Sequence, residues 1–105
     1  MIDFTKQDLT NFKNGSGVVK AEIFEDENNK IMKLKLDKGV SLGLHTHIDT
    51  SEIIYIIEGE AHFIIDGKNE YLKVNDVHYC PQCSSHAVIN EKNETLVLFA
   101  VVSKH

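Results

Sequence analysis

Residues 39–59 read GVSLGLHTHIDTSEIIYIIEG and place two histidines, a polar turn and an apolar strand in close succession. His45 and His47 are two residues apart, so both imidazoles leave the same face of an extended segment, about 6.6 Å apart along the chain. Residues 49–51 (Asp-Thr-Ser) form a turn that reverses the chain. Glu52 is therefore expected to face the two histidines from the neighbouring strand.

Two imidazoles and one carboxylate on the same side of an ion form the facial arrangement that non-haem iron and related metals use. Imidazole and carboxylate suit Fe, Mn, Co, Ni, Cu and Zn, so the pattern indicates a divalent transition metal without identifying it. Asp49 shares strand parity with the histidines and is an alternative carboxylate ligand, although aspartate more often caps a turn. A short His-x-His pattern on its own is more often a pair of solvated strand histidines.

Apolar segments separated by turn residues extend on both sides of this stretch. The alternation in residues 30–36 places Met32, Leu34 and Leu36 on one face, as in a half-buried strand. The same reasoning predicts strands over residues 18–24, 30–36, 40–47, 52–58, 61–65, 71–74, 77–80, 86–89 and 95–102. Roughly nine short strands with frequent turns indicate an all-β antiparallel sandwich or barrel. Residues 3–13 are interpreted as a short helix.

The spacing of five residues in the central stretch resembles the first motif of the cupin superfamily. Five residues separate Gly39 from His45, one separates His45 from His47, four separate His47 from Glu52, and six separate Glu52 from Gly59. Every fixed position of that motif is present in this sequence.

A second segment resembles the second cupin motif, with Pro81, His86 and Asn90 at the expected spacing. Asn75 and Cys83 stand where the motif has glycines. Asparagine is the residue that best tolerates a positive φ after glycine, so Asn75 is compatible with the motif. Cys83 is accommodated less easily, and we expect the turn after Pro81 to deviate from the family form.

The resemblance implies a small all-β double-stranded β-helix, or jelly-roll barrel, that forms a single cupin domain over residues 1–105. An N-terminal arm over residues 1–15 is expected to precede the barrel over residues 16–103. The resemblance also implies that three histidines and a glutamate hold the divalent transition metal: His45, His47, Glu52 and His86.

The charge of the chain disfavours several kinds of partner. Lysines number 11, arginine is absent, and Asp plus Glu number 16, which gives a net charge of −5. An acidic chain is a poor candidate for binding nucleic acid or an anionic membrane. No apolar run approaches the roughly 18 residues of a membrane span, and the N-terminus has no signal-peptide core, so a cytoplasmic location is expected. Without the bidentate arginine fork, a strongly anionic substrate is disfavoured.

The resemblance implies most often a metal-dependent enzyme of the dioxygenase or isomerase type, acting on a small, weakly charged molecule. An apolar barrel lumen, which favours a partly apolar substrate such as a phenol or diketone, is expected from four residues: Leu44, Ile54, Ile56 and Phe63. The alternative is a non-catalytic module or sensor that binds a metal and a small molecule. A homodimer is expected, because the exposed edge strands of a small barrel must be covered, and residues 1–25 and 94–102 are candidates to pair with a second copy.

Three further features are candidates for roles near the metal. His62 is either a proton shuttle in the lumen or a solvent-facing strand residue, since parity alone does not place it. His78 shares a strand face with Cys80 and is a candidate partner of a metal ligand. Cys80 and Cys83 form a Cys-x-x-Cys in a turn between strands, where no following helix would activate a thiol, so oxidation there is expected to be regulatory at most.

Overall fold

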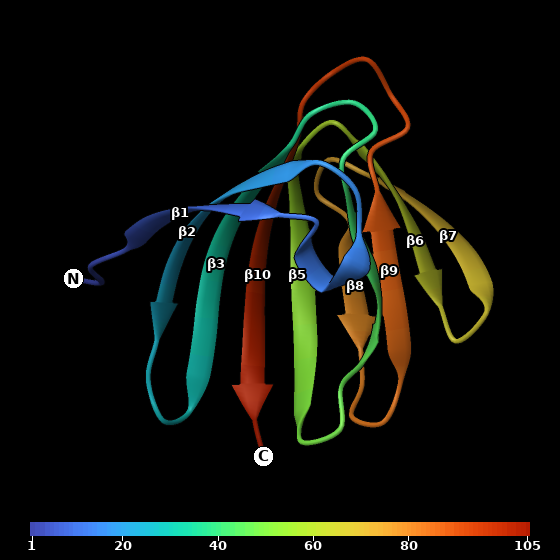
Figure 1. Cartoon of the computed structure of the whole chain (residues 1–105). Helices are drawn as coiled ribbons and strands as arrows, with labels where there is room; N and C mark the ends of the chain where they lie inside the picture. The colour runs from blue at the N-terminus through green and yellow to red at the C-terminus, as the bar shows by residue number, and fades with distance from the viewer.

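Ten strands form two antiparallel sheets that pack face to face, as Figure 1 shows. The computed structural model describes all residues from 1 to 105. The larger sheet has the order β1 (Thr5–Thr10), β2 (Val18–Glu25), β3 (Asn29–Leu36), β10 (Leu96–Lys104), β5 (Thr50–Glu58) and β8 (Val77–Cys80). The smaller sheet has the order β4 (Ser41–Thr46), β9 (Ser85–Ile89), β6 (Glu60–Ile65) and β7 (Lys68–Lys73). The predicted all-β jelly-roll barrel is confirmed.

The core lies between the inner faces of the two sheets. In β3, Met32, Leu34 and Leu36 are buried while Lys33 and Lys35 are exposed, as the period-two alternation predicts. Burying a leucine side chain contributes about 1.5–3 kcal/mol, so each such strand face stabilises the packing of the sheets. Fifteen buried apolar residues form one continuous cluster in this way.

The N-terminal segment is a strand, so the helix expected over residues 3–13 is wrong. β1 pairs with β2 in register from Thr5 opposite Ile23 to Thr10 opposite Val18. A three-residue 3₁₀ turn, η1 (Phe12–Asn14), follows it and is the only helical segment. The strand is mostly exposed, so its conformation comes from hydrogen bonds to β2 and not from a buried helical face.

No helix of the structure has the length and hydropathy of a membrane span.

The C-terminal strand is central in its sheet. β10 is hydrogen-bonded to β3 along one side and to β5 along the other. The expectation that residues 94–102 pair with a second copy is therefore wrong, because both edges of that strand are already used. β1 keeps a free edge at the end of the larger sheet.

A β-bulge in β4 reverses the alternation of its side chains. Leu42 lies opposite Val88 and His45 lies opposite His86, so three steps along β4 match two steps along β9. Leu42 and His45 both face inward, whereas Leu44 is 65% exposed. The expectation that Leu44 lines the lumen is wrong for this reason.

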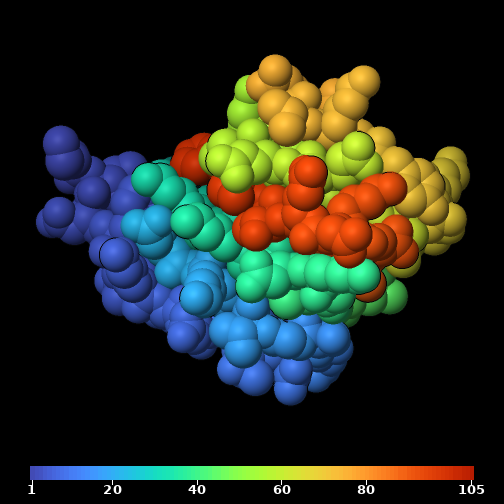
Figure 2. Space-filling view, turned by 90° about the horizontal axis from the view of Figure 1, so that it is seen from above, coloured from blue at the N-terminus to red at the C-terminus, as the bar shows by residue number.

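The two ends of the barrel differ. One end carries the β2–β3 turn, the β4–β5 turn and the C-terminus (Figure 1). Figure 2 shows the opposite end, where the β9–β10 loop lies across the centre and the N-terminal strands run along one side. The side chains of the two cupin-like motifs meet inside, near the first of these ends.

Candidate metal centre

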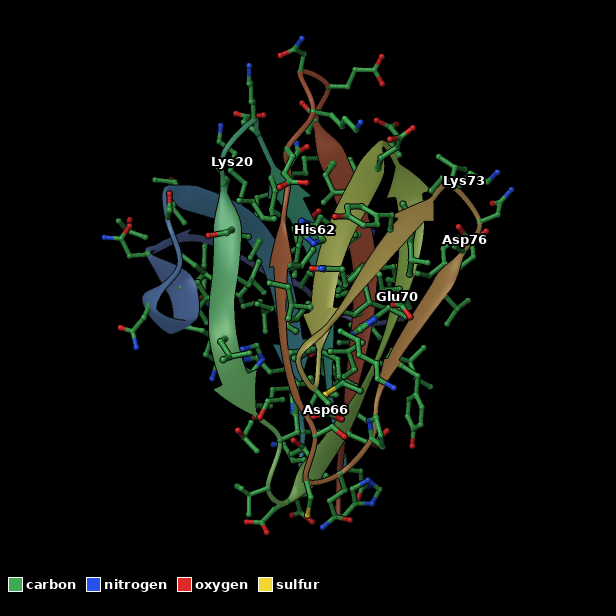
Figure 3. All side chains as sticks on the ribbon, turned by 90° about the vertical axis from the view of Figure 1, so that its right-hand side faces the viewer. Lys20, His62, Asp66, Glu70, Lys73 and Asp76 are labelled. Carbon is green, nitrogen blue, oxygen red and sulfur yellow. The ribbon has the colours of Figure 1, made fainter.

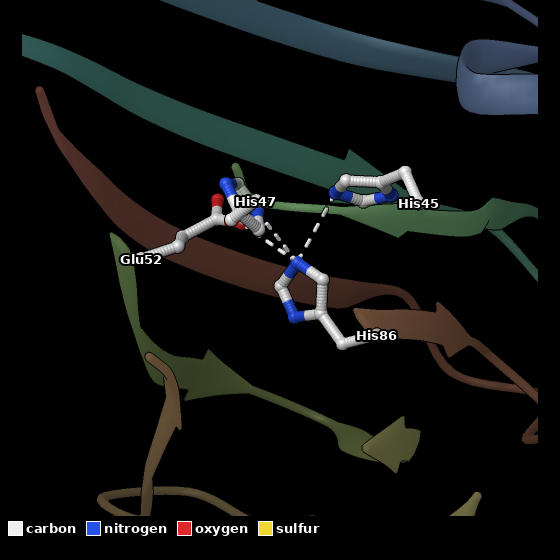
Figure 4. A group of neighbouring side chains, drawn as sticks. All are labelled: His45, His47, Glu52 and His86. Atoms are coloured by element: carbon white, nitrogen blue, oxygen red, sulfur yellow. Dashed lines mark hydrogen bonds and ion pairs between the residues drawn. The ribbon is translucent and has the colours of Figure 1, made fainter. Parts of the chain in front are cut away.

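Four polar side chains converge inside the barrel, as Figure 4 shows. His45 comes from β4, His47 from the residue after β4, Glu52 from β5 and His86 from β9. Their ligand atoms all lie within 4.8 Å of one another. His86 is central: its Nε2 lies 3.1 Å from His45 Nε2, 3.0 Å from His47 Nε2 and 3.0 Å from Glu52 Oε1. The separation of His47 Nε2 from Glu52 Oε1 is 3.1 Å.

The spacing and chemistry of these atoms fit a transition-metal ion. Two neighbouring ligands at right angles, each about 2.1 Å from one ion, are about 3.0 Å apart. The four measured separations of 3.0–3.1 Å match that value. Three imidazole nitrogens and one carboxylate oxygen suit the same borderline cations that the sequence indicates. The cluster can hold a divalent metal, and its atoms do not distinguish which one.

Each imidazole is oriented by a hydrogen bond that points away from the cluster. These bonds run from His45 Nδ1 to Gly43 O at 2.7 Å, from His47 Nδ1 to Thr50 Oγ1 at 2.6 Å, and from His86 Nδ1 to His78 Nε2 at 2.9 Å. When a cation takes the place of the Nε2 protons, a proton on each Nδ1 leaves the lone pair of each Nε2 directed into the cluster. All three rings are thus arranged to donate to a cation through the same type of nitrogen.

The protonation states also favour a cation. Without a metal, burial by itself would raise the pKa of Glu52, but Nε2–H groups of His47 and His86 that donate to its carboxylate lower it to about 2. Burial lowers the pKa of His45, so its neutral form is favoured. At neutral pH the cluster therefore holds an ionised carboxylate and a neutral His45, which are the forms that bind metals.

The cluster lies at the inner end of a pocket of about 240 Å³, and His45, His47 and Glu52 are among its lining residues. The rest of the lining contains three lysines, Lys13, Lys30 and Lys104, and one glutamate outside the cluster, Glu25. Only four lining residues are apolar: Phe12, Met32, Leu42 and Val102.

The expectation that apolar residues form the lumen beside the cluster is wrong. Ile54, Ile56 and Phe63 are buried as predicted, but they belong to the core and do not line this pocket. Three larger hollows, of about 290, 450 and 500 Å³, contain none of the four cluster residues. Nine of the thirteen residues that line the pocket beside the cluster are polar or charged, and three of these are lysines.

Two of the alternative site residues lie outside the cluster. Asp49 is exposed in the β4–β5 turn. His62 lies on the outer face of β6, where its ring stacks on Tyr71 at 4.4 Å and its Nδ1 lies 3.0 Å from Glu91 Oε1. Its neighbours Ala61 and Phe63 point inward, so the proton-shuttle interpretation of His62 is wrong.

The two cysteines occupy different environments. Cys80 is fully buried, and burial together with the charge of Glu52 raises the pKa of its thiol to about 11, which makes it a poor nucleophile. Cys83 is exposed and adopts a φ of 73°, the left-handed conformation that favours glycine. Its N–H donates to His47 O at 2.6 Å, so this turn helps to hold the chain beside the cluster.

His78 contacts the cluster from behind. It is 1% exposed on β8, and besides its bond to His86 its Nδ1 donates to Glu70 Oε1 at 2.6 Å. Burial lowers the pKa of His78, which favours its neutral form. The sequence marked His78 as a candidate partner but missed Glu70. The strand pattern in the sequence pointed to this region only approximately. It predicted a strand over 71–74, one residue beyond Glu70, whereas β7 spans Lys68–Lys73.

Comparison with known proteins agrees with the fold. The sequence model described as the cupin domain matches residues 32–102. The chain belongs to the cupin domain family. This cupin is 31% identical to the oxalate-binding protein of Thermotoga maritima, over 95% of this chain and 88% of that protein.

Solved structures of cupins superpose closely on this one. The crystal structure of a predicted oxalate decarboxylase from Thermotoga maritima has a TM-score of 0.92 and 28% identity, and the match covers 100% of this cupin and 99% of that chain. An RmlC-like cupin from Shewanella frigidimarina has a TM-score of 0.81 over 97% of this chain and 85% of that chain. Its identity of 21% means that this second likeness shows the fold alone.

Proposed function

We propose that this cupin binds a small dicarboxylate of the oxalate type through a divalent transition metal held by His45, His47, Glu52 and His86. The observation that carries the proposal is the convergence of three Nε2 atoms and one carboxylate oxygen at the inner end of a pocket that contains lysines. When bound, the metal supplies a Lewis-acid centre that accepts oxygen atoms of the ligand.

The lining of the pocket supports an anionic ligand. Lys13 and Lys30 contribute positive charge to the lining of the pocket, and Lys104 is paired with Glu25 at 2.7 Å and offsets the charge of that glutamate. Without arginine, the chain has no bidentate fork for a carboxylate. A metal and lysines together replace that fork, because the metal provides the directional contact and the ammonium groups provide charge. The weakly charged, partly apolar ligand expected from the sequence fits this lining less well.

The four protein ligands support chelation of the metal by the small molecule. Metals that prefer six ligands retain open positions when a protein supplies four. A dicarboxylate with adjacent oxygen atoms fills two such positions at once, which a monocarboxylate does less favourably. The name of the Thermotoga maritima relative, an oxalate-binding protein, agrees with this class of ligand.

The state of the carboxyl groups favours binding over decarboxylation. Glu25 and Glu52 are the only carboxyl groups that line the pocket. A hydrogen bond and the charge of Lys104 lower the pKa of Glu25, and the pKa of Glu52 is about 2. Both groups are ionised at neutral pH, so each would have to take up a proton before it could protonate the carbanion that loss of CO₂ creates. Dioxygenase- or isomerase-type turnover is the alternative, and the O₂ uptake measured below tests its dioxygenase form.

Isothermal titration calorimetry of oxalate into Mn²⁺-loaded and metal-free protein tests the proposal. We expect heat of binding only with metal, weaker binding of acetate, and none of a phenol such as catechol. A His62→Phe variant, altered far from the pocket, should bind as the wild type does. Oxalate binding that is unchanged by metal removal would contradict the proposal, as would no binding to the loaded protein. Release of CO₂ or uptake of O₂ would instead support an enzyme.

A further inference from the structure

A hydrogen-bonded series of three side chains, Glu70, His78 and His86, connects the cluster to the protein surface. Glu70 lies on β7, the last strand of the smaller sheet, and His78 lies on β8, the last strand of the larger sheet. Figure 3 shows Glu70 between the ribbons of these two strands. Its carboxylate accepts from His78 Nδ1 at 2.6 Å, and His78 Nε2 lies 2.9 Å from His86 Nδ1. This hydrogen-bonded series thus crosses from one sheet to the other and ends at His86, the central residue of the cluster.

If both imidazoles of this hydrogen-bonded series are neutral, only one arrangement of their protons is possible. An ionised carboxylate only accepts, so His78 must donate to Glu70 through Nδ1–H. The Nε2 of a neutral His78 is then an acceptor, and His86 must donate to it through its own Nδ1–H. Once a cation takes the place of the proton that His86 Nε2 shares with Glu52, this nitrogen presents its lone pair, and it lies 3.0–3.1 Å from the three other ligand atoms.

The surroundings of His78 indicate that an imidazole is needed there for more than packing. The ring is fully buried and stacks on Phe63 at 3.9 Å with an interplanar angle of 9°. An apolar ring would fill this position in the core without the cost of burying two polar nitrogens. The other two imidazoles of the cluster donate to a backbone carbonyl and a hydroxyl, so His86 alone has a partner that a charged group orients.

We propose that His78, held by Glu70, is a positioning residue that fixes the tautomer and ring orientation of His86. This inference rests on the proposed metal function, since it explains how the central ligand presents Nε2 to a cation. Such outer partners increase the basicity of a ligand imidazole and its affinity for metal. Glu70 is 38% exposed at its side chain, so its replacement leaves the core intact and tests the effect at a distance from the metal.

Two variants separate the effects of charge and orientation. His78→Phe keeps a ring against Phe63 but removes the acceptor for His86. Glu70→Gln keeps an oxygen that accepts from His78 but removes the negative charge. We expect metal affinity, measured by chelator competition with Co²⁺ and Zn²⁺, to fall about 10–100-fold in His78→Phe and several-fold in Glu70→Gln.

The matched control is a second imidazole–carboxylate pair, between His62 on β6 and Glu91 in the β9–β10 loop. His62 Nδ1 lies 3.0 Å from Glu91 Oε1, and His62 is not part of the cluster. Glu91→Gln changes the same chemical group at the same kind of partner, and we expect metal affinity to stay within about twofold of wild type. If His78→Phe does not fold, Glu70→Gln and Glu91→Gln still form a complete comparison.

NMR of the histidine ring nitrogens in the metal-free proteins gives a measurement that would not change if His78 only packed the core. Ring ¹⁵N–¹H correlations report which nitrogen of His86 is protonated. We expect a protonated His86 Nδ1 in wild type, whether or not Nε2 also carries a proton toward Glu52, and loss of that Nδ1 proton in a larger fraction of His78→Phe molecules. An unprotonated His86 Nδ1 in wild type would overturn the inference, as would unchanged Nδ1 protonation together with unchanged affinity in both variants. A wild type that binds no metal would instead overturn the proposed function, and the NMR comparison would still decide the role of His78.

Discussion

Leu42 and His45 both face the inside of the barrel although they are three residues apart on one strand. A regular strand would place them on opposite faces, since side chains alternate with period two. The extra residue in β4, between the pairs Leu42–Val88 and His45–His86, removes this conflict. One strand thereby contributes an apolar residue to the core and an imidazole to the cluster.

Gly43 makes this bulge compatible with the N-terminal segment. A Cβ at this position would overlap the backbone carbonyl oxygen of Lys13 in η1. We expect Gly43→Ala to lower the free energy of unfolding by about 3 kcal/mol, measured by urea denaturation, because the neighbour is backbone and cannot move freely. Gly39→Ala is the control: φ is +81° but nothing lies within 4 Å, so about 1 kcal/mol is expected. Equal losses in the two variants would contradict this account of Gly43.

Cys83 occupies a conformation that glycine adopts more easily. Its φ is 73°, and a Cβ in the left-handed region costs about 1–2 kcal/mol. Cys83→Gly should therefore increase the free energy of unfolding by about 1 kcal/mol, less what glycine loses in unfolded-chain entropy. The side chain is exposed and its backbone bond to His47 is retained, so metal affinity should not change. A destabilised Cys83→Gly protein would mean that the thiol makes a favourable contact.

The metal-free protein should lose stability in acid through the cluster. The pKa of folded Glu52, about 2, lies below its ordinary value of 4.5, so its contribution is present above pH 4.5 and is lost as pH falls toward 2. His45 also has a lowered pKa, so its contribution is present above pH 6.5 and declines at lower pH. Urea midpoints between pH 8 and pH 3 measure this. Glu52→Gln should show a smaller loss between pH 4.5 and pH 3, and an identical loss would contradict the role of Glu52.

The outer face of β5 and β8 is apolar and suits a second copy of the chain. Five residues there are 38–56% exposed: Ile53, Tyr55, Ile57, Val77 and Tyr79. Ile53 lies opposite Tyr79 and Tyr55 opposite Val77, so these residues form one continuous patch. We expect a homodimer by light scattering and a monomer for the Ile53→Lys/Tyr79→Lys variant. Tyr71→Lys, equally accessible on the other sheet, should remain dimeric. A monomeric wild type at micromolar concentration would refute this prediction.

Much of the fold could be predicted because its strands have strong local signals. The β-branched and aromatic run from Ile53 to Ile57 predicts a strand from residue types alone, and β5 spans Thr50–Glu58. The motif spacing also selected the four side chains that the fold brings together. Residues close in sequence, or joined by a recognisable spacing, can be assigned in this way.

The features that were missed depend on contacts between distant segments. β1 is a strand because it pairs with β2, and its own residues have little β-branched or aromatic content. The inward position of His45 depends on a bulge that is defined only against β9. Glu70 and His78 lie eight residues apart on strands of different sheets, so their hydrogen bond follows from the packing of the sheets and not from any local pattern.

The central claim is that the four converging side chains bind one metal ion, and an anomalous-difference map from crystals of the Mn²⁺-loaded protein tests it most directly. The account predicts one peak per chain, about 2.0–2.3 Å from Nε2 of each of the three histidines and from a Glu52 oxygen. A map without a peak between these side chains, or with the metal bound elsewhere and the imidazoles turned apart, would contradict it.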